Sequence, residues 1–209
     1  MFDQSVRKEA YILFRKGEWF ILGWIYFILM FFLEAFLPAW TGDENGIIEN
    51  IQLLVLFGSM YYCYKLCSCK LPDWGGEQKS LWKAGIIYFF LLIMREISWG
   101  RTFVLHPDGS MYQYSEMGLY GKLVHPLVGI LIIATVYFLY RAKIFSFIKK
   151  VKIPVKTFCL LLLFIAVQYV AEHMDTPFKG NVAEELCELG AYIMMYYLIK
   201  DSVQRLKKQ

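Results

Sequence analysis

Six long hydrophobic stretches separated by short connections dominate this chain, and they leave few ways for it to fold. They are residues 19–40, 47–66, 81–99, 123–140, 155–174 and 182–199. Each is close to the ~20 residues with which an α-helix crosses ~30 Å of hydrocarbon. Hydrophobic residues make up 58% of the chain, above the roughly 45 to 50% of soluble domains. We therefore expect an all-α, polytopic membrane bundle of six transmembrane helices, a single membrane domain over residues 1–209.

The distribution of lysine and arginine predicts how these helices are oriented. Positive charge is retained in the cytoplasm when connections are short. Of the 22 Lys and Arg residues, all but Arg95, Arg101, Lys122 and Lys179 lie in the two terminal tails, in the connections after the second and fourth stretches, or within three residues of those connections. We therefore expect a multi-pass protein of the cell membrane with both termini in the cytoplasm.

The net charge of +4 is explained by these retention signals. It gives no argument for binding nucleic acid. The partner that the sequence does imply is membrane lipid, and the oligomeric state stays open.

Polar residues intrude on the hydrophobic stretches almost only at the ends facing the Lys/Arg-poor connections. A charge placed in hydrocarbon costs about 2.5 to 3.5 kcal/mol, so this one-sided placement needs a reason. The inner halves, such as 86–92 and 160–165, are aliphatic and aromatic. We expect a polar site that opens toward the outer face. The polar residues placed in this way are Glu34, Glu49, Asn50, Gln52, Arg95, Glu96, Ser98, Trp99, Arg101, Lys122, His125, Gln168, Tyr169, Glu172, His173, Asp175, Glu184, Glu185 and Glu188.

Helical spacing places several of these residues on common faces. Tyr169 and His173 are four apart in the fifth stretch, as are Glu184 and Glu188 in the sixth, and side chains at this spacing share a face. Ionisable groups inside a bilayer face the bundle interior and pair with one another. These stripes should therefore point inward.

The same residues could hold a divalent metal such as zinc or manganese. The candidate ligands are His125, His173, Glu96 and Glu188, a mixed imidazole and carboxylate set that these metals accept. A three-ligand open site would activate water. No H-E-x-x-H spacing is present, and the alternative is that these groups neutralise one another without a metal.

The segment 95–101, R-E-I-S-W-G-R, is the densest local group of polar residues. Arg95 and Arg101 could grip a phosphate, for which the planar guanidinium is well suited. In the alternative interpretation Trp99 is an interfacial belt residue and Glu96 pairs with an arginine. The outer loop that follows, residues 102–121, contains a P-D-G turn and interleaved Met and Tyr residues. It is either an ordered cap or a plain connector with an aromatic anchor.

The piece E-I-S-W-G-R at 96–101, with E-N at Glu49 and Asn50, resembles the E-E-I-S-W-G-Q motif of uncharacterised bacterial integral membrane proteins. Arg95 and Arg101 replace the first Glu and the Gln of that motif. The resemblance implies a bacterial inner-membrane protein and brings no activity with it. A looser similarity is to the alkaline-ceramidase-type membrane hydrolases, whose Ser, Asp and His residues surround a metal. In this chain Ser98, His125, His173 and the Glu49–Asn50 pair would take those parts. The seven-span layout and the terminal H-x-x-x-H of those hydrolases are absent from the sequence.

The leading hypothesis is an enzyme that hydrolyses or transfers a group on a lipid or lipid-linked headgroup at the outer leaflet. In it Glu96, His125, His173 and Glu185 are catalytic or metal-binding residues. Substrate binding falls to Arg95, Arg101, Glu49, Asn50, Trp99 and Tyr169. One-sided polarity favours this hypothesis, because an enzyme needs access from one leaflet only.

Two alternatives from other classes stay open. Carboxylates in membrane helices are also typical of cation or proton transporters and channels, although the inner halves offer almost no polar relay. The polar residues could equally form a buried network in a non-catalytic sensor or assembly factor, where it would specify helix packing.

Overall fold

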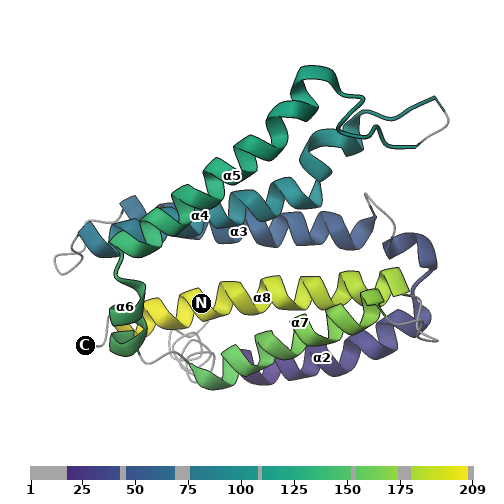
Figure 1. Cartoon of the computed structure of the whole chain (residues 1–209). Helices are drawn as coiled ribbons and strands as arrows, with labels where there is room; N and C mark the ends of the chain where they lie inside the picture. Colours follow the sequence, from purple (N-terminus) through teal and green to yellow (C-terminus); the bar gives the residue numbers. More distant parts are fainter. Residues whose placement is uncertain are drawn as a thin grey trace, which may run out of the picture. The chain divides into compact units, whose positions relative to one another are not determined.

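The computed structural model describes residues 18–42, 46–68, 76–107, 110–151, 154–173 and 180–206, and within them the protein is all-α. One isolated β-bridge joins Leu105 to Met111. The elements are α2 (Glu18–Phe36), η1 (Ala39–Gly42), α3 (Ile47–Ser68), α4 (Gly76–Glu96), η2 (Ser98–Phe103), α5 (Gly118–Arg141), α6 (Ile144–Val151), α7 (Val155–His173) and α8 (Gly180–Leu206). Figure 1 shows their order along the chain.

The helices belong to two compact units. Unit 1 is formed by residues 1–43 and 152–209 and contains α2, η1, α7 and α8, whereas unit 2 is formed by residues 44–151 and contains α3 to α6 with η2. Unit 1 thus joins segments from the two ends of the chain. Each unit is described by itself.

In unit 1, α8 contacts both α2 and α7 (Figure 1). It runs antiparallel to both: the ring of Trp19 at the start of α2 stacks on Tyr197 near the end of α8, with centroids 4.1 Å apart. Farther along, the Tyr26 hydroxyl donates to the Leu186 carbonyl at 2.8 Å. α8 is buried from Leu186 to Tyr192, so its neighbours shield it from solvent or lipid.

Glycines allow the helices of unit 1 to approach closely. A Cβ atom on Gly23 of α2 would lie 2.6 Å from Leu160 of α7, and one on Gly190 of α8 would overlap the ring of Phe164. Phe164 is fully buried. Close approach of this kind lets membrane helices associate through van der Waals packing.

In unit 2, the middle position belongs to α4, which contacts both α3 and α5. A Cβ on Gly85 of α4 would lie 2.9 Å from the Cys63 sulfur of α3. At the same end of α4, the Lys83 ammonium lies over the Phe138 ring of α5 at 5.7 Å. Both flanking helices are therefore antiparallel to α4.

Among the described residues, four stretches are long and apolar enough to cross a membrane: Trp19–Phe36, Ala39–Ser68, which contains α3, Gly118–Arg141 and Val155–His173. The two expected spans outside this set correspond to α4 and α8, and their crossing stays a prediction. Each of these two helices contacts two other long helices of its own unit. A helix with protein neighbours on two sides can carry the ionisable residues that lower its hydropathy.

The helix bounds differ from the expected stretches mainly at the ends facing the polar residues. α4 ends at Glu96 and is followed by η2, and α5 starts at Gly118, within the loop expected at 102–121. The first helix, α2, ends at Phe36, shortly before Pro38. A proline disfavours the helical conformation of the residue that precedes it. α8 continues to Leu206. Met174, Asp175 and Lys179 lie outside the described residues.

The Gly190→Ala substitution should destabilise unit 1. The added methyl group overlaps Phe164, and overpacking of this kind costs about 1 to 3 kcal/mol. Thermal or denaturant unfolding of the detergent-solubilised protein measures the effect. Gly129→Ala in α5 is the matched control, because a Cβ atom there would meet none of the described side chains or neighbouring segments within 4 Å. Equal stability of the two variants would contradict the close packing of α8 on α7.

Candidate functional site

The chain makes a left-handed turn directly after α4. Ser98, Trp99 and Gly100 have φ angles of 43°, 54° and 83°, and only glycine adopts this region without strain. A non-glycine residue held there costs about 1 to 3 kcal/mol and persists only when its surroundings fix it. Strain of this kind concentrates at functional sites.

Two tyrosines from the following segments hold this turn in place. The Tyr114 hydroxyl donates to the Ser98 carbonyl at 3.3 Å, and the Tyr120 hydroxyl donates to the Trp99 carbonyl. The indole of Trp99 is buried. The turn is therefore fixed from the outer loop and from the first turn of α5.

Arg101 is the charged residue that this turn positions. Its guanidinium lies over the Tyr114 ring at 4.4 Å, and its Nη1 donates to the Tyr112 carbonyl at 3.5 Å. The Nε atom is buried and has no hydrogen-bond acceptor within the described part of the chain. A cation with an unused donor fits an anionic group.

His125 meets the same aromatic ring. The imidazole packs edge-on against Tyr114, with ring centroids 5.3 Å apart, and its side chain is exposed. Tyr114 therefore contacts both the cation from η2 and the imidazole from α5. We call the side chains of Arg101, Tyr114 and His125 together the Arg101 site.

The outer loop is ordered around an ion pair. The His106 ring stacks on Tyr112 with centroids 3.6 Å apart, and its Nε2 lies 3.4 Å from a carboxylate oxygen of Glu116. The Gln113 N–H donates to the same carboxylate at 2.7 Å. The Gln113 bond first, and His106 second, lower the pKa of Glu116 below its ordinary value of 4.5. The tip of the expected P-D-G turn, residues 108 and 109, lies outside the described residues.

A glycine on α5 seats the outer loop against the helix. A Cβ atom at Gly121 would overlap the carbonyl of Tyr114. Gly121 is buried. The loop segment that carries Tyr114 therefore packs directly on the α5 backbone.

The other predicted residues of unit 2 lie at the same end. Glu96 is buried at the end of α4 and pairs with the exposed Arg95 at 3.2 Å. Because α3 is antiparallel to α4, its first turn lies beside this end. There Glu49 is buried, and the Asn50 amide donates to the Gly46 carbonyl at 2.8 Å. The Arg95–Glu96 contact joins neighbours in sequence at the end of one helix.

Unit 1 also gathers its polar residues at one end. The Gln168 amide of α7 donates to the Glu188 carboxylate of α8, and Glu188 is buried. His173 stacks on Tyr169 with centroids 4.2 Å apart, while its Nδ1 lies 3.0 Å from the Tyr169 carbonyl. Both of these rings are exposed. Both predicted stripes were expected to face inward. Glu188 of one stripe is buried, whereas Tyr169 and His173 of the other are on the surface.

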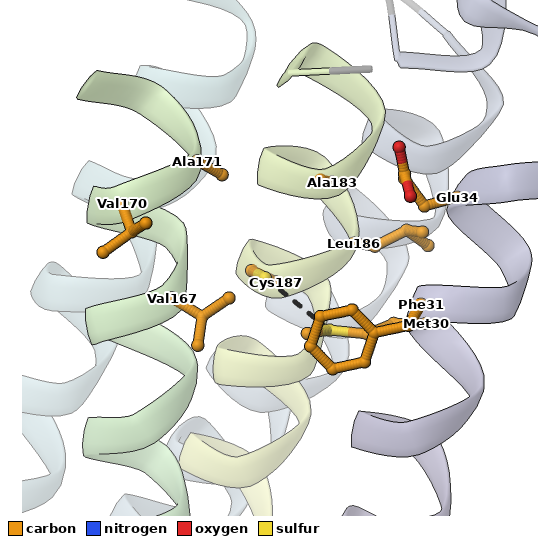
Figure 2. A pocket seen from close by; sticks show the side chains of 9 residues that line it. All are labelled: Met30, Phe31, Glu34, Val167, Val170, Ala171, Ala183, Leu186 and Cys187. Atoms are coloured by element: carbon orange, nitrogen blue, oxygen red, sulfur yellow. Dashed lines mark hydrogen bonds between the residues drawn. The ribbon is translucent and has the colours of Figure 1, made fainter. Parts of the chain in front are cut away.

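Unit 1 contains an apolar cavity of about 70 Å³ between α2, α7 and α8 (Figure 2). Its lining residues are Met30, Phe31, Glu34, Val167, Val170, Ala171, Ala183, Leu186 and Cys187. The Cys187 thiol donates to the Met30 sulfur at 3.6 Å. Apart from the carboxylate of Glu34 the lining is apolar, so the cavity fits a small apolar group and not a headgroup.

The predicted site residues divide between the two units. Unit 2 holds Glu49, Asn50, Arg95, Glu96, Trp99, Arg101 and His125, and unit 1 holds Tyr169, His173, Glu185 and Glu188. The expected metal ligands are divided in the same way, two in each unit. Metal binding by His125, His173, Glu96 and Glu188 stays a prediction, as does a catalytic role for Glu185.

Tyr114 was not among the predicted site residues, although it connects Arg101 to His125. The sequence did show aromatic residues interleaved through the outer loop, but spacing alone gives no partner for any of them. His106 and Glu116 were missed for the same reason. Their pairing depends on a local hairpin that begins at the Leu105–Met111 bridge.

Comparison with known proteins gave no similarity that bears on function. The chain matches no family model, no curated protein and no solved structure. The geometry of the two polar ends therefore carries the functional argument.

The order of the outer loop should depend on pH through Glu116. Because folding lowers this pKa, the ionised carboxylate stabilises the folded loop above pH 4.5. This stabilisation is lost as pH falls through the lowered pKa. We expect the Gln113 amide to lose protection from hydrogen exchange as pH falls below about 4.5, after correction for intrinsic rates. Glu116→Gln should remove this pH dependence. An unchanged pH profile in that variant would contradict the role of Glu116.

Proposed function

We propose that the chain is a six-span membrane protein with both termini in the cytoplasm and its polar ends toward the outer leaflet. In unit 2, Arg95 and His125 lie at one end, while Lys83 and Arg141 lie at the opposite end of the same helices. By the positive-inside rule, the end that is rich in Lys and Arg lies in the cytoplasm. The N-terminal tail, whose basic residues add to this asymmetry, lies outside the described residues. A bacterial inner membrane is the location that the sequence resemblance implies.

We further propose that the protein is an enzyme acting on a lipid or lipid-linked headgroup at that leaflet. The observation that carries this proposal is the Arg101 site. A guanidinium with a buried, unused donor lies against a tyrosine ring that also contacts an exposed imidazole. It thus combines an anion-binding group with an acid/base group, the minimum for hydrolysis or transfer at a phosphate or carbonyl.

Each member of the Arg101 site has a distinct chemical role in this proposal. Arg101 binds a headgroup oxygen and stabilises the negative charge that develops on it in the transition state. His125 accepts a proton from the attacking water or hydroxyl and returns one to the leaving group. Tyr114 orients both, and the strained turn from Ser98 to Gly100 fixes Arg101 in place.

The remaining predicted residues have supporting roles. Glu96 neutralises Arg95 at the end of α4, and the first turn of α3 contributes Glu49 and Asn50 at the same end of unit 2. In unit 1, His173, Tyr169, Glu185 and Glu188 are proposed as further polar groups at its corresponding end. Of the metal ligands predicted from the sequence, unit 2 holds Glu96 and His125. A bound zinc or manganese ion would activate water for the same chemistry.

The distribution of polarity favours this function over transport. An ion pathway needs polar groups through the whole membrane, and the 160–165 segment of α7 contains only leucine, phenylalanine and isoleucine. The cavity of unit 1 is likewise apolar. A non-catalytic network is the second candidate, favoured by the paired Gln168 and Glu188.

Arg101→Gln should weaken binding of a phosphate headgroup. Losing a charge-assisted hydrogen bond costs about 1.5 to 3 kcal/mol, which is roughly ten- to a hundredfold in affinity. Dioctanoyl phosphatidylglycerol, added to detergent-purified protein, is the probe, and stabilisation against thermal unfolding reports binding. Dioctanoylglycerol, which lacks the phosphate, should not discriminate between wild type and variant. Lys122→Gln is the matched control, because Lys122 is an exposed cation one turn before His125.

The catalytic half of the proposal is tested on the same lipid. Mass spectrometry follows release of the headgroup or its transfer, and His125→Ala should lower the rate by about a hundredfold or more while affinity is kept. Binding without turnover in the wild type would favour the non-catalytic candidate. Affinity that is equal in Arg101→Gln and wild type would contradict the assignment of the Arg101 site.

A further inference from the structure

α6 is a short amphipathic helix that follows α5 at its Lys/Arg-rich end. Its sequence, I-F-S-F-I-K-K-V, has apolar residues at helical spacing and two lysines in succession. Phe145 is 80% exposed and Ile148 is 39% exposed. A phenylalanine left this open on so short a helix needs an apolar surrounding other than the described protein.

The start of α6 is fixed to unit 2 by a sharp reversal of the chain. Lys143 has a φ of 50°, and its ammonium pairs with Glu77 at the start of α4 at 2.5 Å. Figure 1 shows that α6 turns away from the axis of α5 instead of continuing it. A helix that crosses the membrane and then turns aside at its end leaves the next segment at the membrane surface.

One aromatic contact sets the rotation of α6 about its own axis. Phe147 packs edge-on against Trp82 of α4, with centroids 6.3 Å apart, and Trp82 is buried. Phe147 is therefore occupied by protein, while Phe145 and Ile148 remain open. The exposed apolar surface belongs to specific residues and is not a general property of the helix.

The charges around α6 indicate what covers this surface. Lys149 is exposed, and Lys150, Lys152 and Lys156 follow closely in the sequence. The apolar surface of α5 continues up to Tyr140, which is 82% exposed. Apolar side chains next to a run of lysines, at the end of an apolar helix, match the boundary between acyl chains and anionic headgroups.

We infer that α6 lies in the plane of the membrane on the Lys/Arg-rich side, with Phe145 and Ile148 among acyl chains and Lys149 bound to anionic phospholipid headgroups. The partner is thus an anionic lipid surface. The inference rests on membrane insertion of α5 and is independent of the Arg101 site, so failure of either proposal leaves the other standing.

Hydrogen exchange of residues 144–151 tests this inference in the full-length protein. The protein is placed in nanodiscs of phosphatidylcholine alone or of phosphatidylcholine with phosphatidylglycerol. We expect exchange in α6 to be about tenfold slower in the anionic nanodiscs, because each lysine near such a surface favours the bound state. The double variant Lys149→Gln/Lys150→Gln should lose this difference, and Phe145→Ser should weaken protection in both lipids.

Two controls separate lipid binding from changes in the fold. Lys65→Gln removes a lysine at the end of α3, which lies over the Tyr61 ring, and it should leave exchange in α6 unchanged. Exchange of the α4 amides is the control for the fold of unit 2, and it should be the same in every variant. The inference is overturned if α6 exchanges equally in the two lipids. It is also overturned if the effect of phosphatidylglycerol persists in the double lysine variant.

Discussion

The structure depends on one constraint, which is that an ionisable side chain inside a membrane helix must face protein or water. Both units satisfy it in the same way. The helix with the most carboxylates contacts both of the other long helices named here in its unit: α4 contacts α3 and α5, and α8 contacts α2 and α7. α5 shows the opposite behaviour, because its candidate span is only 6% buried. A helix that exposes almost all of its apolar surface can carry few charges.

The same constraint explains why the polar residues lie at helix ends. Glu188, for example, is buried and accepts a hydrogen bond from the Gln168 amide. In unit 2 the end of α4 carries a further cost, the left-handed turn from Ser98 to Gly100. Tyrosine hydroxyls on the carbonyls of this turn offset that cost and leave Arg101 held against Tyr114. The strained turn would thus serve to position the Arg101 guanidinium.

The length and hydrophobicity of the apolar stretches were enough to predict an all-α bundle, because helices in lipid satisfy their backbone hydrogen bonds locally. The one-sided positions of Glu96 and His125 could also be seen in the sequence. The role of Tyr114 could not, since it depends on the outer loop folding back onto Gly121. The division into two units was equally hidden, because α2 packs with α7 and α8 across more than a hundred residues of sequence. The sequence also contained the amphipathic pattern of α6, but only the structure identifies Phe145 as exposed.

Membrane crossing by α4 is the central claim, because the topology and the outer position of the Arg101 site both follow from it. The most direct measurement is labelling of single cysteines by a membrane-impermeant thiol reagent in a cysteine-free background. Lys79→Cys lies on the first turn of α4 and Ser110→Cys in the outer loop, and both positions are exposed. The account predicts that Ser110→Cys is labelled in intact cells and Lys79→Cys only after permeabilisation. Labelling of both from the same side would contradict it.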